Sequence, residues 1–183
     1  MKDREFKAAS RVTLAALGLA ALLIFGSVGV RAATDAPPDA PKSVALLSVE
    51  FLNDHGDLEP TKPAEQARLA LVESLFKAKL EASGQYRFVP IPPEAQAKIG
   101  AGPEIGACGG CEFAYGKELG ADTAAWIVVQ KVSDLILNIN VYMGDVAARK
   151  MTFVHSVDIR GNTDESWSHG VSYLVKNYLL PAR

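Results

Sequence analysis

The sequence predicts an α/β domain with a single mixed five-stranded sheet, in the order β-α-β-α-β-β-β-α and with strands arranged 2-1-3-4-5. Three observations lead to this fold class. Apolar runs at 44–52 and 122–132 indicate buried strands, and the second is apolar on both faces, as in a central strand. Apolar residues recur every three or four positions across 63–83, as on one face of a helix. Alternating runs at 135–143 and 150–160 predict an antiparallel hairpin.

The remaining elements follow from local signals in the sequence. Segment 85–91 predicts a second strand, which ends at two consecutive prolines. A short helix at 93–99 and a glycine-rich stretch at 100–110 then lead to a helix that begins near Cys111. Because strand crossovers are right-handed, the first three strands are expected to be parallel and the hairpin to extend the same sheet.

The last helix is predicted to begin within "NTDESW", residues 162–167. Asn162 or Thr163 is a suitable cap for its first turn. Asp164 and Glu165 then lie at the positive end of the helix dipole, so capping alone explains them. The apolar stripe of this helix is predicted to consist of Trp167, Val171, Leu174 and Tyr178.

Three segments divide the chain. Residues 1–32 are predicted to be an export signal, with a basic start, an uncharged apolar run at 12–30 and cleavage after Ala32. If the signal stays uncleaved, the same run becomes a membrane anchor. Residues 33–43 form a proline-rich tether, and 44–183 form one periplasmic domain.

Composition narrows the class of partner. Removing five basic and two acidic signal residues from totals of 19 and 21 leaves 14 and 19, a net charge of −5. This net negative charge argues against nucleic-acid binding, which requires a basic surface. An exported protein meets an oxidising compartment, most simply the bacterial periplasm, where paired cysteines form disulfides. No cofactor is predicted.

Cys108 and Cys111 form a C-G-G-C pair just before a predicted helix. Haem attachment requires histidine after the second cysteine, and position 112 is glutamate, which excludes it. A thiol-redox centre remains open, because a helix N-terminus lowers a thiol pKa. However, thioredoxin-like proteins need a proline that faces such a motif, and the only proline after Cys111 is Pro181, close to the end of the sequence. Lys117 is also too far along the helix to activate a thiol. A structural disulfide is therefore the favoured interpretation.

Other candidate residues carry weaker signals. His55, His155 and His169 show no spacing typical of zinc ligands, and His155 is predicted to be a hydrogen-bonded core histidine. No metal site is predicted, and the acidic loop with Asp54, Asp57 and Glu59 is interpreted as a solvated turn. No set of residues has the composition and spacing of a known type of catalytic site. The polar side of the strand at 135–143 is the candidate interaction or ligand face, and it consists of Asn138, Asn140 and Tyr142.

Three segments of the chain resemble a known protein family. They are the C-x-x-C pair followed by "LGAD", the strand "LILNI" and the run "RGNTDESW". The family comprises secreted proteobacterial proteins of unknown function, and the resemblance runs from about Val44 to Leu180. The element order is also similar, more distantly, to the amino-terminal domain of TolB and to periplasmic domains of CsgG-type proteins.

The resemblance implies a non-catalytic periplasmic protein that binds another periplasmic or envelope protein. It also implies a link to quinoprotein alcohol-oxidation systems. Two alternatives stay open: a thiol-redox protein that uses Cys108 and Cys111, and an accessory protein that binds a small molecule or a metal.

Overall fold

The structure is a computed structural model that describes residues 40–180, all of which belong to one compact unit, residues 37–183. The predicted signal and the predicted tether as far as residue 39 lie outside the described residues. Within residues 40–180, no helix combines the length and the apolar character that a membrane crossing requires.

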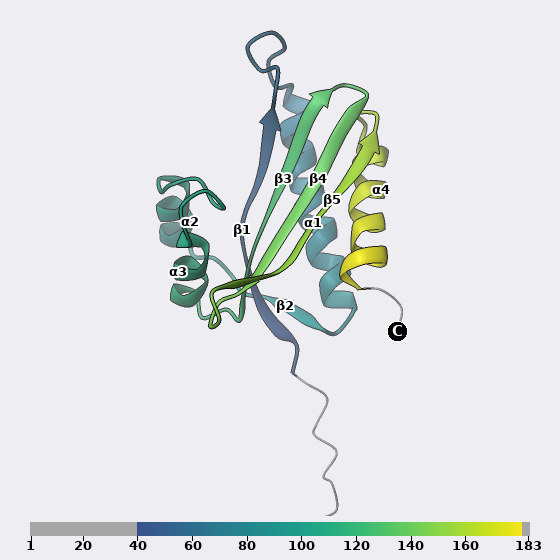
Figure 1. Cartoon of the computed structure of the whole chain (residues 1–183). Coiled ribbons are helices and arrows are strands. Elements are labelled where there is room, and N and C mark those ends of the chain that lie inside the picture. The colour runs from purple at the N-terminus through teal and green to yellow at the C-terminus, as the bar shows by residue number, and fades with distance from the viewer. Residues whose placement is uncertain (1–39, 181–183) are drawn as a thin grey trace, which may run out of the picture. The chain divides into compact units, whose positions relative to one another are not determined.

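The elements occur in the predicted order, including the short helix predicted at 93–99, and a π-helical turn follows the last helix (Figure 1). Their bounds are β1 Lys42–Asn53, α1 Pro63–Ala82, β2 Tyr86–Phe88, α2 Pro93–Gly100, α3 Cys111–Glu118, β3 Thr123–Ser133, β4 Ile136–Asp145, β5 Lys150–Arg160, α4 Asp164–Leu174 and a π-helical turn Val175–Leu179.

The described strands form one mixed sheet of five strands in the order β2-β1-β3-β4-β5. β1 is parallel to both β2 and β3, whereas β3, β4 and β5 are joined in antiparallel pairs. The predicted fold class, strand order and direction of the hairpin are therefore confirmed.

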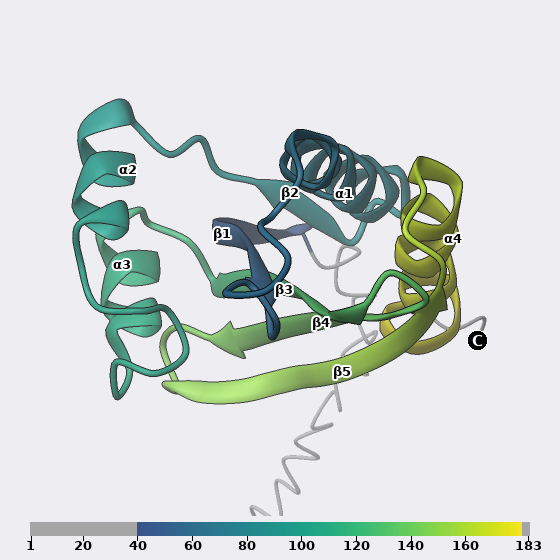
Figure 2. The same ribbon diagram turned by 90° about the horizontal axis from the view of Figure 1, so that it is seen from above.

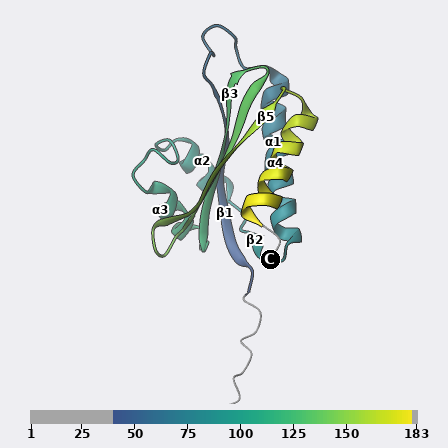
Figure 3. The ribbon, with the colours of Figure 1, turned by 45° about the vertical axis from the view of Figure 1, so that its right-hand side comes forward.

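Helices cover both faces of this sheet. Figures 2 and 3 show α1 and α4 on one side of the sheet and α2 and α3 on the other. The larger apolar core lies under α1 and α4 and contains Phe76, Ile127, Ile139 and Trp167. The smaller core lies under α2 and α3, where Ala45, Leu47 and Ala124 are fully or almost fully buried. β3 contributes to both cores, which explains why its sequence is apolar on both faces.

The amino-terminal boundary of the sheet differs from the predicted one. β1 begins at Lys42, so Lys42 and Ser43 belong to the sheet although the tether was predicted to reach residue 43. Two tertiary contacts account for this: the backbone N–H of Lys42 donates to the carbonyl oxygen of Gln85 at 2.9 Å, and the backbone N–H and the hydroxyl of Ser43 donate to Asp122 Oδ2 at 2.8 and 2.7 Å. β2 is shorter than predicted and ends at Phe88, since Pro90 has no N–H to continue the ladder.

The last helix is confirmed in most respects. Thr163 caps it, since its hydroxyl accepts the backbone N–H of Ser166 at 3.2 Å, and Trp167 is fully buried. The prediction for Tyr178 is wrong, because this side chain is 41% exposed. Its place in the π-helical turn explains the difference, because a wider turn shifts side chains off the α-helical stripe. The prediction of a hydrogen-bonded core histidine is also wrong, because His155 is only half-buried and its ring stacks on Tyr178.

Candidate functional site

Within residues 40–180, one part of the sheet is not covered by a helix on the side of α2 and α3. These helices pack on β1 and β3 near the start of each strand, and the remainder of that side faces the viewer in Figure 1. Strand pairing places seven side chains together there, which we call the open face. They are Leu52, Val128, Gln130, Asn138, Asn140, Tyr142 and Val154.

The open face contains all three residues of the predicted interaction face. Asn138, Asn140 and Tyr142 are half-buried and lie in one row along β4. The amide of Asn140 donates to the carbonyl oxygen of Val128 at 3.1 Å, which fixes its orientation. The side chain of Gln130 donates to both carboxylate oxygens of Asp54, at 2.8 and 3.1 Å. Apolar and amide groups therefore alternate across this surface.

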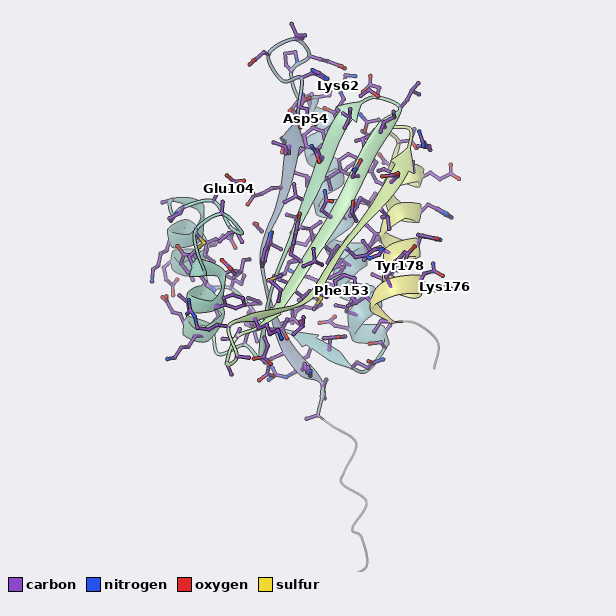
Figure 4. The ribbon with its side chains drawn as sticks, in the orientation of Figure 1. Asp54, Lys62, Glu104, Phe153, Lys176 and Tyr178 are labelled. Atoms are coloured by element: carbon purple, nitrogen blue, oxygen red, sulfur yellow. A yellow bond between two sulfur atoms is a disulfide. The ribbon has the colours of Figure 1, made fainter. Side chains whose placement is uncertain are left out.

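A hollow of about 310 Å³ joins the open face to the loop that precedes Cys108. Asn140 and Tyr142 line it, whereas Asn138 lies outside it on the same strand. The Tyr142 ring stacks on Trp126 with ring centroids 5.0 Å apart. The opposite wall is loop 104–107, and Glu104 projects from the loop in Figure 4. The β4 row and the loop that leads to Cys108 thus border one region of the surface.

Glycine keeps the loop close to the sheet. Gly106 has a φ of +87°, and a Cβ atom on it would lie 2.9 Å from Trp126 Nε1. Both the backbone conformation and the space exclude a larger residue, because L side chains disfavour this φ and the indole occupies the position. The wall of the hollow therefore depends on this glycine.

Cys108 and Cys111 are joined as a disulfide, with their Cα atoms 5.5 Å apart. Cys111 is the first residue of α3, and its backbone N–H points at Cys108 Sγ across 3.2 Å. The two intervening glycines have φ angles of +69° and +107°, so the tight loop between the cysteines needs glycine at both positions. The pair connects the wall of the hollow to the start of α3.

Two charged side chains surround the cysteine pair. Glu112 is buried, and its Oε2 lies 3.2 Å from Cys108 Sγ. Arg149, from the turn between β4 and β5, donates to the carbonyl oxygen of Gly110 at 3.3 Å. The sequence alone points to Lys117 as the nearest basic residue, because Arg149 is 38 positions beyond Cys111 in the chain. Only the folded hairpin brings it there.

The described residues contain one group of His, Cys, Asp and Glu side chains close enough to share a metal ion. It consists of Cys108, Cys111 and Glu112, whose candidate ligand atoms lie within 4.8 Å of one another. In the disulfide state the two sulfurs are bonded to each other, so neither is a thiolate ligand.

A cluster of charges lies at the end of β3, with Lys131 and Glu65 buried and the other members partly exposed. The ammonium group of Lys131 lies 2.8 Å from Asp134, 3.0 Å from Glu65 and 3.2 Å from Glu59. Lys62 adds a second cation, 2.8 Å from Glu59 and 2.9 Å from Asp134. Glu59 is 42% exposed, in agreement with a solvated acidic turn, and it pairs in addition with both lysines.

Hydrogen bonding fixes the charge states in this cluster. Burial alone would lower the pKa of Lys131, but hydrogen bonds to Asp134, Glu65 and Glu59 outweigh it and raise the pKa. Burial also opposes ionisation of Glu65, yet hydrogen bonds from Lys62, Lys131 and Asn162 hold its pKa below the usual value. Each charged group in the cluster is paired with an opposite charge from the same cluster, so we assign it a structural role.

Comparisons with known proteins place the chain in a family. A family model, DUF3280, described as "Protein of unknown function (DUF2380)", matches residues 42–179 and confirms the resemblance seen in the sequence. No curated protein matches the chain.

Several solved structures are similar to the chain. One is the lipoprotein GNA1162 from Neisseria meningitidis, with 18% identity, 76% of this chain and 99% of that chain covered, and a TM-score of 0.48. Another is the C-terminal domain of LpoB from Salmonella enterica, with 13% identity, 66% and 84% coverage and a TM-score of 0.46. A third is TolB from Acinetobacter baumannii, with 15% identity, 78% and 29% coverage and a TM-score of 0.44.

Proposed function

This chain belongs to the DUF3280 family, and we propose that it is an exported, non-catalytic domain that binds another periplasmic protein through its open face. The export signal predicted in residues 1–32 and the oxidised cysteine pair support an oxidising compartment outside the cytoplasm.

One observation carries the proposal: an uncovered stretch of sheet exposes apolar and amide side chains together. Leu52 is 51% exposed and Val154 59% exposed, and half-buried Val128 and Tyr142 lie between them. A mixture of aromatic, aliphatic and hydrogen-bonding groups is typical of the middle of a protein interface.

Charge at the border of the open face indicates the chemistry of the partner. Glu50 pairs with Val128 and Asp158 pairs with Asn138, so both carboxylates lie on this side of the sheet, where Arg160, opposite Ile136, adds one cation. Glu104 stands on the opposite wall of the hollow. We infer that the partner presents apolar side chains bordered by basic ones, because opposite charges at an interface rim favour encounter.

Charge substitutions at Leu52 test this surface. The partner is captured from periplasm with the mature protein, identified by mass spectrometry, and its affinity is then measured by calorimetry. Leu52→Lys is expected to weaken binding about tenfold or more, since it places a cation where a basic partner docks. Leu52→Glu, of similar bulk, should weaken binding less, and Ala78→Lys on the exposed side of α1 should leave it unchanged. Equal affinity of Leu52→Lys and wild type would refute the proposed surface.

A second candidate function, thiol–disulfide exchange, is favoured by the surroundings of the cysteine pair. The N–H of Cys111 would stabilise a Cys108 thiolate, Arg149 holds the carbonyl of Gly110 within the same loop, and Glu112, 3.2 Å from Cys108 Sγ, would accept the proton of this thiol. In such a reaction the Cys108 thiolate attacks a disulfide of a protein substrate and releases one substrate thiolate. Cys111, having lost its proton, then attacks Cys108 and releases the second thiolate, so the substrate gains two electrons and two protons.

Removing the cysteines separates the two candidate functions. For the binding domain, Cys108→Ser/Cys111→Ser should lower the free energy of unfolding by about 2 kcal/mol, the loop-entropy value for a four-residue ring. Affinity for the captured partner should be retained wherever this variant is folded. For an exchange protein, a thiol of the reduced pair would titrate well below about 8.5 and react quickly with a model disulfide. If the reduced pair shows this reactivity, and if Arg149→Ala slows it, thiol–disulfide exchange is the function and the binding proposal is wrong.

A further inference from the structure

β1 has a strand on both sides over only a short part of its length. β2 pairs with it at positions 42–44, whereas β3 pairs with it from Val44 to Asn53. The last backbone hydrogen bond on the β2 side runs from the N–H of Val89 to the carbonyl oxygen of Val44, at 2.9 Å. Figure 1 shows β2 beside the lower part of β1 only. Within residues 40–180, segment 46–52 therefore forms a free edge of the sheet.

Two residues direct their backbone groups toward this free edge. The N–H of Asp54 donates to the carbonyl oxygen of Lys131 at 3.1 Å, so the even-numbered residues at the end of β1 direct their backbone groups toward β3. Because these groups alternate along a strand, those of Val49 and Phe51 point away from β3. Each residue has one N–H donor and one carbonyl acceptor. Donors and acceptors at this spacing match the backbone of an extended peptide.

A groove of about 310 Å³ borders the free edge, and we call it the β1 groove. Ser48 and Val49 of β1 line it, together with Leu69 and Glu73 of α1 and Gln96 of α2. It shares no lining residue with the hollow beside the β4 row. The hydroxyl oxygen of Ser48 is buried and has no hydrogen-bond partner within residues 40–180. Such groups are rare in native proteins, so this hydroxyl, next to free backbone groups, indicates a surface that a ligand completes.

The side chains along the edge indicate which peptide fits. On the side of α1, Val49 and Phe51 pack with Leu69 against the larger core, so this side is apolar. On the other side of the sheet, Glu50 is half-buried and forms no ion pair within residues 40–180. Directly opposed residues of neighbouring strands share a side of the sheet. An added strand would therefore direct apolar side chains toward α1 and a basic side chain toward Glu50.

We propose that an extended segment of the partner, with alternating apolar and basic residues, adds to the sheet as a strand along the free edge of β1. Its backbone pairs with Val49 and Phe51, and a basic residue lies beside Glu50. This binding mode rests on the proposed function, because Leu52 of the open face belongs to the same stretch of β1. It specifies that the partner binds through backbone as well as side-chain contacts.

Hydrogen exchange followed by NMR tests the free edge and the added strand. In the unbound protein, the amides of Val49 and Phe51 should exchange much faster than those of Glu50 and Leu52, which face β3 and serve as internal controls. A heptapeptide of alternating valine and lysine, in excess, should slow exchange at Val49 and Phe51 by about tenfold or more. An isomer with its lysines grouped at one end should protect them less. Unchanged exchange at both residues in millimolar heptapeptide would overturn the proposal.

Charge exchange tests the basic residue of the added strand. Glu50→Lys should bind the valine–lysine heptapeptide about tenfold or more weakly than wild type does, and it should instead prefer a valine–glutamate heptapeptide. A folding defect would weaken the binding of both peptides and would not reverse the preference. Fluorescence anisotropy of labelled peptides measures each affinity. If wild type binds the two peptides equally, no basic residue is recognised by Glu50.

Proline substitution separates strand addition from binding at the open face. Val49→Pro removes an N–H at the free edge and leaves the ladder with β3 intact, whereas Val49→Ala shortens the side chain and keeps the N–H. Only the proline variant should bind the captured partner several-fold more weakly, the effect of one lost hydrogen bond. If Leu52→Lys weakens this binding and Val49→Pro does not, the open face is correct and strand addition is wrong. If Val49→Pro does not fold, hydrogen exchange in the wild-type protein decides.

Discussion

Replacing Lys131 by methionine is expected to lower the free energy of unfolding by about 3–5 kcal/mol, because it leaves a buried carboxylate without its cation. Lys131 is 1% exposed and Glu65 is 0% exposed, and their charged groups lie 3.0 Å apart. Methionine is unbranched and of similar length, so it fills most of the vacated space. The loss then reports the orphaned charge of Glu65, and a urea titration followed by circular dichroism measures it.

A double variant separates charge from packing. Lys131→Met/Glu65→Gln removes both buried charges but keeps an acceptor for the N–H of Lys62, which now donates to Glu65 at 2.6 Å. It should recover more than half of the loss, since replacing both members of a buried pair is often close to neutral. Glu59 and Asp134 are 42% and 48% exposed and stay hydrated. A loss below about 1 kcal/mol in the single variant would contradict a structural role for the pair.

The cluster also determines how stability responds to acid. The pKa values of Glu59, Glu65 and Asp134 lie below their usual values in the folded protein. The unfolded chain therefore takes up protons first as the pH falls, and the stabilisation is complete only above the unfolded pKa values of about 4. Wild type should lose stability between about pH 5 and pH 3 more steeply than Lys131→Met/Glu65→Gln. Equal slopes would mean that these carboxylates are not held by Lys131.

The sheet could be predicted from the sequence because its signals are local. Apolar periodicity distinguishes the helix at Pro63–Ala82 from the strands around it, and chain handedness then orders the first three strands. The row of Asn138, Asn140 and Tyr142 could be found in the same way, since alternation along one strand shows which side is polar. What alternation could not show is that loop 104–107 would face this row and form a hollow.

The decisive contacts that the sequence does not show join distant segments. Lys131 pairs with Glu65, which is 66 positions away, and Arg149 reaches Gly110 across 39 positions. One signal was available, because Lys131 continues the inward positions of Ile127 and Val129 along β3. A lysine at an inward position needs a buried carboxylate. Its identity depends on how the start of α1 meets the end of β3, which only the packed structure shows.

Trp167→Ala should lower the free energy of unfolding by about 3–5 kcal/mol, as truncation of large aromatic side chains in cores does. Trp167 is 0% exposed, and its ring stacks on Phe51 with centroids 5.7 Å apart. Its indole N–H donates to Asn162 Oδ1 at 3.1 Å. Alanine would therefore remove the main contact between α4 and the sheet and would also leave a cavity in the larger core.

The indole N–H of Trp167 also connects this residue to the charged cluster through Asn162. Asn162 uses its amide group to donate to Glu65 at 2.6 Å and to Asp134 at 3.2 Å, so Trp167 orients a side chain that joins α4 to both. Trp167→Phe keeps an aromatic ring but loses this donor, and it should cost less than alanine, with about 1 kcal/mol from the hydrogen bond. Thermal unfolding followed by circular dichroism compares the two variants. If Trp167→Ala lowers the free energy of unfolding by less than about 1 kcal/mol, α4 does not pack on the sheet through Trp167. That result would also contradict the inference that Trp167 orients Asn162 toward Glu65 and Asp134.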